Sequence, residues 1–288
     1  MLTIFGNIKI NDQFRLRHFK DSFKSFNKIS DEWIINIRGE RRKEAMQFLK
    51  KSLGSKLVLF DLTDDSRGWS VNALEMIKKV SNEYVFIWNE DHINLASQNN
   101  YKHIMQELKK EDVDSMWYSW WLFGKSRKGY NKLPLKRLKY VDTVLLTKER
   151  WQKINKPGYP FYIISFMSIF RKSFFEKLLK LDSHMFPYEY TQKLYKLFDF
   201  FDSIGIEVAR DGLFFKLNKF FSFKFRKFSE VTPFNLEREQ YRTDILPIKI
   251  ALSKKELFAC IEDDLEEPGY SLVSRGLYKS KASVKNKG

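Results

Sequence analysis

The sequence predicts an α/β protein: a mostly parallel sheet with helices on both faces, in a single compact domain with a C-terminal helical extension. The first observation is a regular alternation of short apolar runs and amphipathic segments over residues 1–95. That order favours right-handed crossovers and therefore parallel strands. The second is a length of 288 residues with 43% hydrophobic residues, which is enough for a substantial core. The third is that no internal repeat and no linker rich in Pro, Gly or Ser divides the chain.

Strands and helices can be assigned in order along the first third of the chain. Apolar runs closed by turn residues are typical of strands, and apolar residues repeated every three or four positions are typical of helices. Phe19, Phe23 and Phe26 lie at i, i+4 and i+7 and mark one helical face. Further helical faces follow at residues 45–53 and 73–80, and the four strands are expected at residues 2–10, 33–37, 57–60 and 84–88.

After residue 96 the pattern is looser. Helices are expected at residues 100–110, 172–181 and 184–201, and strands at residues 116–123, 140–147, 163–170 and 206–209. We therefore divide the single domain into residues 1–95, residues 96–240 and a C-terminal extension of residues 241–288 with a basic tail.

Composition narrows the function classes. The chain carries 52 Lys and Arg against 36 Asp and Glu, a net charge of +16. Such a surplus is typical of proteins that bind nucleic acid, an anionic membrane or phosphorylated substrates, and also of surfaces that are basic only for solubility. The single cysteine, Cys260, indicates a reducing compartment and excludes zinc ribbons and iron–sulfur clusters. No leader peptide, membrane span, zinc-hydrolase, dinucleotide or P-loop signature is present, so we expect a cytoplasmic protein.

Polar residues follow three of the predicted strands. Ligands of parallel sheets bind at the carboxyl ends of the strands, which directs attention to Arg38, to residues 61–67 and to residues 89–92. The last of these, Asn89-Glu90-Asp91-His92, offers carboxylate and imidazole ligands for a divalent cation beside phosphate oxygens. An incidental polar strand end is the alternative interpretation.

The order of elements and this strand ending resemble the GT-A glycosyltransferases, especially the family 2-like branch. Residues 84–88 stand where that family has an apolar strand, and Asn89-Glu90-Asp91 where it has its Asp-x-Asp motif. Residues 65–70 resemble the family's Gly-containing turn, residues 168–171 its segment of small residues and Arg, and residues 186–190 its Glu-Asp segment.

The resemblance implies a role for each matching residue. Asp91, helped by Glu90 and His92, would hold Mg or Mn, and Glu189 would be the general base, with Asp182 and Glu207 as replacements. The remaining expected contacts fall into two sets. The nucleotide contacts are Arg38, Asp61, Arg67, Asn89 and Glu90, and the acceptor contacts are Trp117, Trp120 and Arg171.

The resemblance also has departures. Asn89 stands where the family has its first Asp, Tyr190 where it has the second acid of the Glu-Asp pair, and Leu74 where it has an Asn. A transferase-like fold without activity is therefore one alternative.

Two aromatic segments have double interpretations. The tryptophans and tyrosine of residues 117–121 could stack on a sugar or belong to the core. Residues 214–228 combine a stripe of Phe with Lys and Arg, typical of a helix at an anionic membrane surface and equally of a core element with a solvated basic face.

The sequence thus predicts a metal-assisted glycosyltransferase. It would move a sugar from a nucleotide-diphosphate donor to a saccharide or lipid-linked acceptor, with inversion, in the assembly of a surface polysaccharide or glycolipid at the inner face of the cell membrane. The alternative from another class is a non-catalytic basic protein that binds nucleic acid or membrane. Nucleic acid is the less favoured partner, because the basic residues are spread along the chain without a recognition motif.

Overall fold

One nine-stranded sheet organises the molecule. The computed structural model describes residues 2–63, 69–117, 129–154, 163, 168–183, 245–262 and 271–279. Across the sheet the strands follow the order β3-β2-β1-β4-β9-β6-β10-β8-β7, and β11 and β5 form a separate pair. The strands are β1 (Leu2–Lys9), β2 (Glu32–Arg38), β3 (Leu57–Phe60), β4 (Tyr84–Ile87), β5 (His92–Asn94), β6 (Ser115–Trp117), β7 (Lys136–Arg137), β8 (Val141–Leu146), β9 (Ser168–Arg171), β10 (Ile248–Ser253) and β11 (Phe258–Cys260). The helices are α1 (Gln13–Phe26), α2 (Arg42–Leu53), the 3-10 turn η1 (Gly54–Lys56), α3 (Trp69–Ile77), α4 (Gln98–Lys110), α6 (Lys148–Ile154) and α7 (Lys172–Ser183).

The sheet is mostly parallel by strand direction. Strands β3, β2, β1 and β4 are mutually parallel. Strand β9 runs antiparallel to both of its neighbours, β4 and β6, so that β6 again points the same way as β4. Strand β10 is parallel to β6, and β8 is antiparallel to β10. The expected α/β class with a mostly parallel sheet is therefore confirmed, with β9 and β8 as the reversed strands.

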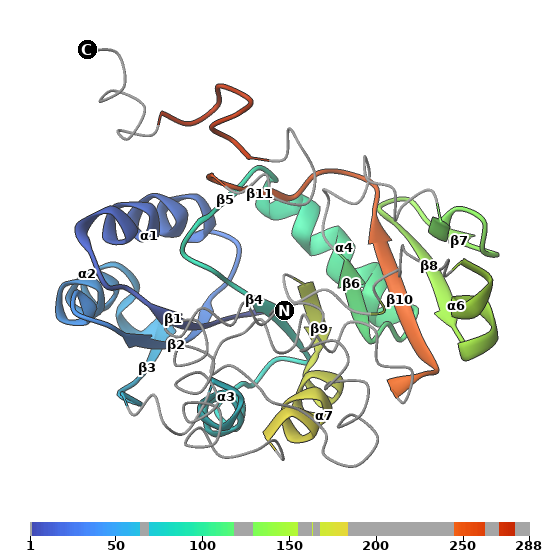
Figure 1. Ribbon diagram of the computed structural model, residues 1–288, viewed down its shortest axis with the longest axis horizontal. Helices are drawn as coiled ribbons and strands as arrows, with labels where there is room; N and C mark the ends of the chain where they lie inside the picture. The colour runs from blue at the N-terminus through green and yellow to red at the C-terminus, as the bar shows by residue number, and fades with distance from the viewer. Residues whose placement is uncertain are drawn as a thin grey trace, which may run out of the picture.

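Helices cover both faces of the sheet, as Figure 1 shows for α1 and α2 on one side and α3 and α7 on the other. Successive residues of a strand point to opposite faces. On one face, Phe5 of β1 packs edge-on against Phe175 of α7, with ring centroids 5.5 Å apart. On the other face, Phe86 of β4 packs against Phe26 of α1 at 5.4 Å and against Phe258 of β11 at 5.2 Å. The core is thus one continuous apolar cluster that places the strand ends rigidly.

Local sequence explains where two of these helices begin. Asp12 accepts a hydrogen bond from the Arg15 backbone N–H at 2.8 Å and caps α1. Ser97 caps α4 in the same way through Asn100. Such caps satisfy a backbone donor that has no partner within the helix.

The C-terminal extension differs from the expectation. We expected a helical extension after residue 240, but its described residues contain the strands β10 and β11 and no α-helix. The reason is burial on both faces: Ile250 and Ala251 point to opposite sides of the sheet and are both fully buried between β6 and β8. The run also alternates strictly, with Ile248, Ile250 and Leu252 on one face and Lys249, Ala251 and Ser253 on the other, a period that suits a strand and not a helix.

None of the helices within the described ranges has both the length and the apolar character needed to cross a bilayer. The elements expected at residues 184–201, 206–209 and 214–228 lie outside the described residues.

Candidate functional site

A basic cavity lies at the carboxyl ends of β1, β2 and β3. Because these strands are parallel, their last residues meet at one edge of the sheet. The cavity measures about 550 Å³, within the usual range for small-ligand sites. Its lining residues are Lys9, Asn11, Arg38, Gly39, Glu40, Arg42 and Thr63.

Three of the lining side chains are cations and one is an anion. Lys9 ends β1, Arg38 ends β2 and Arg42 begins α2, and Glu40 is the acidic residue among them. Arg38 is only 6% exposed, which holds it in place at the strand end. An excess of positive charge in a hollow of this size favours an anionic ligand such as a phosphate.

Asp61 lies at the rim of this cavity. It follows β3 directly, and its Oδ1 is 2.8 Å from Arg42 Nη2. The structure therefore brings Arg38 and Asp61, two of the expected nucleotide contacts, to the same edge.

Gly39 gives the cavity its shape. It has a φ of +93°, and a Cβ at this position would lie 2.5 Å from the Ile10 carbonyl oxygen and 2.6 Å from Asn11 Oδ1. The β2–α2 turn folds back tightly onto the end of β1 here, with Arg41 N–H donating to the same Ile10 oxygen at 3.0 Å. Only glycine lets the chain turn this closely against the end of β1, because any β-carbon here would clash with Ile10 and Asn11.

The segment after β4 runs along α1. The Asn89 carbonyl accepts a hydrogen bond from Ser22 Oγ at 3.3 Å. Glu90 is 7% exposed, and its Oε1 is 2.5 Å from Arg15 Nη1 in the first turn of α1. The Glu90 carboxylate is therefore already paired with a cation of the protein itself, the Arg15 guanidinium.

Two carboxyl groups in this segment have shifted pKa values. Burial, reinforced by the charge of Asp91, raises the pKa of Glu90 to about 7, although Arg15 acts in the other direction. Desolvation acts to raise the pKa of Asp91 too, but the charge and the hydrogen bond of His92 outweigh it and lower that pKa.

Asp91 and His92 lie together with a residue that we did not expect there. His92 Nδ1 is 2.6 Å from Asp91 Oδ1. Cys260 of β11 is paired directly opposite His92 of β5. One ligand atom from each of the three lies within 4.8 Å of the others, a grouping that could hold a metal ion. Two of the three expected metal ligands, Asp91 and His92, therefore lie together. The third expected ligand, Glu90, is paired with Arg15, and Cys260 stands in its place in the group.

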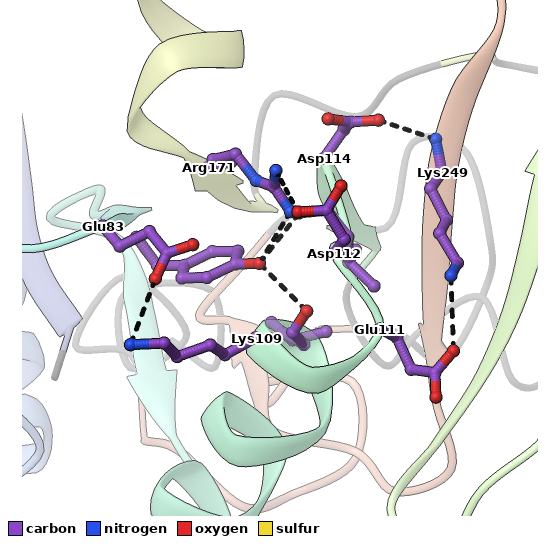
Figure 2. Close-up of polar contacts among 10 residues, drawn as sticks. Glu83, Lys109, Glu111, Asp112, Asp114, Arg171 and Lys249 are labelled. Atoms are coloured by element: carbon purple, nitrogen blue, oxygen red, sulfur yellow. Dashed lines mark hydrogen bonds and ion pairs between the residues drawn. The ribbon is translucent and has the colours of Figure 1, made fainter.

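The expected acceptor residues are placed differently. Trp117 ends β6 at the same edge as the cavity, but it is fully buried, with its ring 4.8 Å from that of Tyr130. Arg171 is opposite Tyr84, the first residue of β4, and so lies at the other edge of the sheet. Figure 2 shows its guanidinium directed at Asp112, with a nitrogen–oxygen distance of 2.5 Å. The structure therefore corrects the expectation for Arg171, whose charge is held by Asp112 away from the cavity.

Several expected residues lie outside the described part of the chain: Arg67, Trp120, Glu189 and Glu207.

A larger cavity of about 940 Å³ opens at the amino edge of the sheet. Its main carboxylate, Glu32, already accepts hydrogen bonds from Ser81 Oγ at 2.6 Å and from Asn82 Nδ2 at 2.9 Å. Because these polar groups satisfy one another and the carboxyl ends of the parallel strands lie at the other edge, we place the candidate site in the smaller cavity.

Sequence reasoning missed Lys9, Asn11, Arg42 and Cys260. Lys9 and Asn11 lie at the carboxyl end of the first strand, so the rule that directed attention to Arg38 at the end of the second strand applies to them as well. No sequence signal could have found Cys260, because it reaches His92 only through the pairing of β11 with β5.

Comparison by sequence finds no matching family and no matching curated protein. Solved structures do show similarity. The chain is similar to residues 1–349 of S. aureus TarS, with 11% identity and a TM-score of 0.43, over 89% of this chain and 59% of that one. It is similar to the same TarS fragment in complex with UDP-GlcNAc, with 13% identity and a TM-score of 0.38, over 64% of this chain and 48% of that one. A third match is a CMP:2-keto-3-deoxy-manno-octonic acid synthetase complexed with CTP, with 12% identity, a TM-score of 0.36, and coverage of 71% and 86%.

This chain thus spans less than two thirds of the TarS structures that it matches. At such identities and TM-scores the function has to be argued from the chain's own residues.

Proposed function

We propose that this protein is a glycosyltransferase that takes a sugar from a nucleotide-diphosphate donor. The observation that carries the proposal is the cavity of Lys9, Arg38 and Arg42, at the sheet edge from which Asn89 and Asp91 also emerge. Clustered cations at the carboxyl ends of parallel strands suit the diphosphate of such a donor.

The chain's own residues would bind and orient that donor. Arg38 offers a planar guanidinium group, which can hold two phosphate oxygens at once, and Arg42, which pairs with Asp61 through Nη2, offers its remaining N–H donors. Lys9 adds a third charge, and Gly39 allows the tight turn between β2 and α2 that carries Arg38 and Arg42 to the cavity. The diphosphate is the leaving group of a transfer, so cations placed around it stabilise the charge that develops as the bond to the sugar breaks.

Asp91 and His92 fit a divalent cation at this edge, since carboxylate and imidazole are both ligands of Mn and related ions. When bound, such a cation would neutralise further charge on the leaving diphosphate.

The acceptor side of the proposal rests on the resemblance of the sequence. Residues 1–95 would form the nucleotide-binding half and residues 96–240 the acceptor-binding half of one domain. Glu189 would take the proton of a saccharide or lipid-linked hydroxyl, and inversion at the sugar carbon would follow from direct attack. The setting would be surface polysaccharide or glycolipid assembly on the cytoplasmic side, with residues 214–228 at the membrane.

A ligand screen tests the proposal. The purified chain is melted with a panel of nucleoside diphosphates and nucleotide sugars, with and without Mn. A donor at about 100 times its dissociation constant should add about 2.7 kcal/mol to the free energy of unfolding.

The best donor is then incubated with the protein, and the released products are separated. Release of a nucleoside diphosphate supports glycosyl transfer, whereas release of pyrophosphate from a nucleoside triphosphate would mark a nucleotidyltransferase instead. If a folded protein binds no nucleotide but does bind anionic vesicles or nucleic acid, with a steep dependence on salt, the binding alternative replaces the proposal.

A further inference from the structure

Asp91, His92 and Cys260 form a compact set of three different ligand atoms. Asp91 and His92 lie where the chain passes from β4 to β5, and Cys260 ends β11. Besides the pairing of His92 with Cys260, the Ile261 N–H donates to the Asp91 carbonyl at 2.7 Å. The two segments are therefore fixed against each other on both sides of the set, and its oxygen, nitrogen and sulfur atoms all lie within 4.8 Å of one another.

The three side chains of the set differ in their exposure to solvent. His92 and Cys260 are buried, with exposures of 6% and 3%. The Phe258 ring packs against the His92 ring at 5.8 Å and closes the inner side. The Asp91 side chain, in contrast, is 45% exposed. A metal ion held here would have protein ligands on its inner side and an approach for solvent or substrate beside Asp91.

The chemistry of the ligand atoms selects among metals. Mg prefers six oxygen ligands and keeps several waters, and a thiol is a poor partner for it. Sulfur together with imidazole and one carboxylate oxygen is the ligand set of zinc and similar transition metals. Three protein ligands with one open position are typical of zinc sites that act on a bound molecule, whereas closed structural sites use four.

We propose that Asp91, His92 and Cys260 bind a zinc-class divalent ion, in strong preference to Mg. On binding, the Cys260 thiol releases its proton to solvent and coordinates as the thiolate. The proposal goes beyond the proposed function, which requires only some divalent cation at Asp91, and it holds whether or not the chain transfers a sugar.

Cobalt provides a direct probe. The metal-stripped full-length protein is titrated with Co²⁺ while its absorbance is followed. A thiolate bound to Co²⁺ gives a near-ultraviolet charge-transfer band, and the chain has one cysteine, so this band can arise only from Cys260. We expect the band to saturate at one Co²⁺ per chain, to disappear when Zn²⁺ is added, and to persist in a large excess of Mg²⁺.

Variants separate ligands from neighbours. Cys260→Ser should abolish the band. Asp91→Asn and His92→Asn should each weaken Co²⁺ binding by about tenfold or more, since loss of a group that only hydrogen-bonds to a metal ligand already costs that much. Glu262→Gln is the matched control: Glu262 lies two residues from Cys260 and is outside the ligand set, and this variant should keep both band and affinity. Circular dichroism and the melting temperature establish that each variant is folded.

Two results would overturn the proposal. One is a folded wild-type protein without a thiolate band at saturating Co²⁺, which would leave Asp91 and His92 as a simple hydrogen-bonded pair. The other is displacement of Co²⁺ by Mg²⁺ at comparable concentrations. Neither result depends on nucleotide binding, so failure here and failure of the proposed transferase function can be told apart.

Discussion

At the scale of single residues, Arg41 and Arg42 are chain neighbours with different surroundings. Arg42 lines the basic cavity and pairs with Asp61 at its rim, whereas Arg41 pairs with Glu44 at 2.7 Å on the surface of α2. We expect Arg42→Ala to raise the dissociation constant of a nucleoside diphosphate about tenfold, since a charge-assisted hydrogen bond contributes about 1.5 kcal/mol. Arg41→Ala should leave it unchanged. Calorimetric titration of both variants with a nucleoside diphosphate measures the two dissociation constants. An equal loss of affinity in Arg41→Ala and Arg42→Ala would show that the cavity is not the donor site.

Gly39 and Gly54 form a second matched pair. Both have positive φ, but a Cβ on Gly54 would meet nothing within 4 Å, whereas on Gly39 it would clash with the end of β1. Gly54→Ala should cost about 1–2 kcal/mol of unfolding free energy, the backbone strain of a β-carbon at a φ of +54° and a ψ of −123°. Gly39→Ala should cost more, about 2–3 kcal/mol, and should also weaken nucleotide binding. Denaturant melts and titrations measure both effects, and full nucleotide affinity in folded Gly39→Ala would contradict the assignment.

Some residues of the candidate site could be predicted from the sequence, and others could not. Arg38, Asp61 and Asp91 were predicted because polar residues that end parallel strands meet at one edge; the structure places them at that edge, and their role in binding stays a prediction. The predicted position of Arg171 was wrong because β9 is antiparallel to β4, so the carboxyl end of β9 lies at the opposite edge of the sheet. No local sequence pattern reveals this reversal. Cys260 was missed for a similar reason, since its partner depends on pairing between segments far apart in the sequence.

At the scale of elements, Glu111 joins the end of α4 to two strands. It is 5% exposed and lies 2.6 Å from Lys136 of β7 and 3.3 Å from Lys249 of β10, the second contact being visible in Figure 2. The hydrogen bond from Lys136, with that from Lys249, lowers the pKa of Glu111. A carboxyl group with a lowered folded-state pKa stabilises the fold above its unfolded pKa, and this stabilisation is lost as the pH falls through the folded value.

Glu111→Gln should therefore reduce the free energy of unfolding by about 1–3 kcal/mol at pH 7. The difference from the wild type should shrink as the pH falls below about 4, where the unfolded carboxyl group becomes protonated, and should disappear below the lowered pKa of the folded group. Glu83→Gln is the control, because Glu83 and Lys109 form an exposed pair at 3.6 Å that should contribute little. Chemical denaturation across a pH series tests both variants, and a pH-independent loss in Glu111→Gln would contradict the electrostatic explanation.

Elements were predictable where periodicity was local. All four strands and three helices expected in residues 1–95 are present, because each has a local apolar pattern, which all except the edge strand β3 bury beside their sequence neighbours. The C-terminal strands were missed although Ile248–Ser253 alternates apolar residues with Lys249, Ala251 and Ser253, because the run is short and its place as a strand depends on insertion between β6 and β8.

At the scale of the whole molecule, the sheet should have a graded stability from centre to edge. β1 is bonded on both sides, to β2 and β4, and β10 is bonded to β6 and β8. β3 ends the sheet at one side, where Val58 is 38% exposed. Hydrogen exchange read by mass spectrometry should therefore be slowest in peptides from β1 and β10 and fastest in β3 and β7. Rapid exchange of β10 would show that it is not integrated into the sheet.

The place of β10 also has a consequence for how the protein is made. The parallel strands β1 to β4 are complete once the first 87 residues have left the ribosome, so this part of the sheet can form early. β6 and β8, in contrast, await a partner that is synthesised only at residues 248–253. During the intervening translation their edges are open to other chains, which makes this interval the one in which chaperones would matter most.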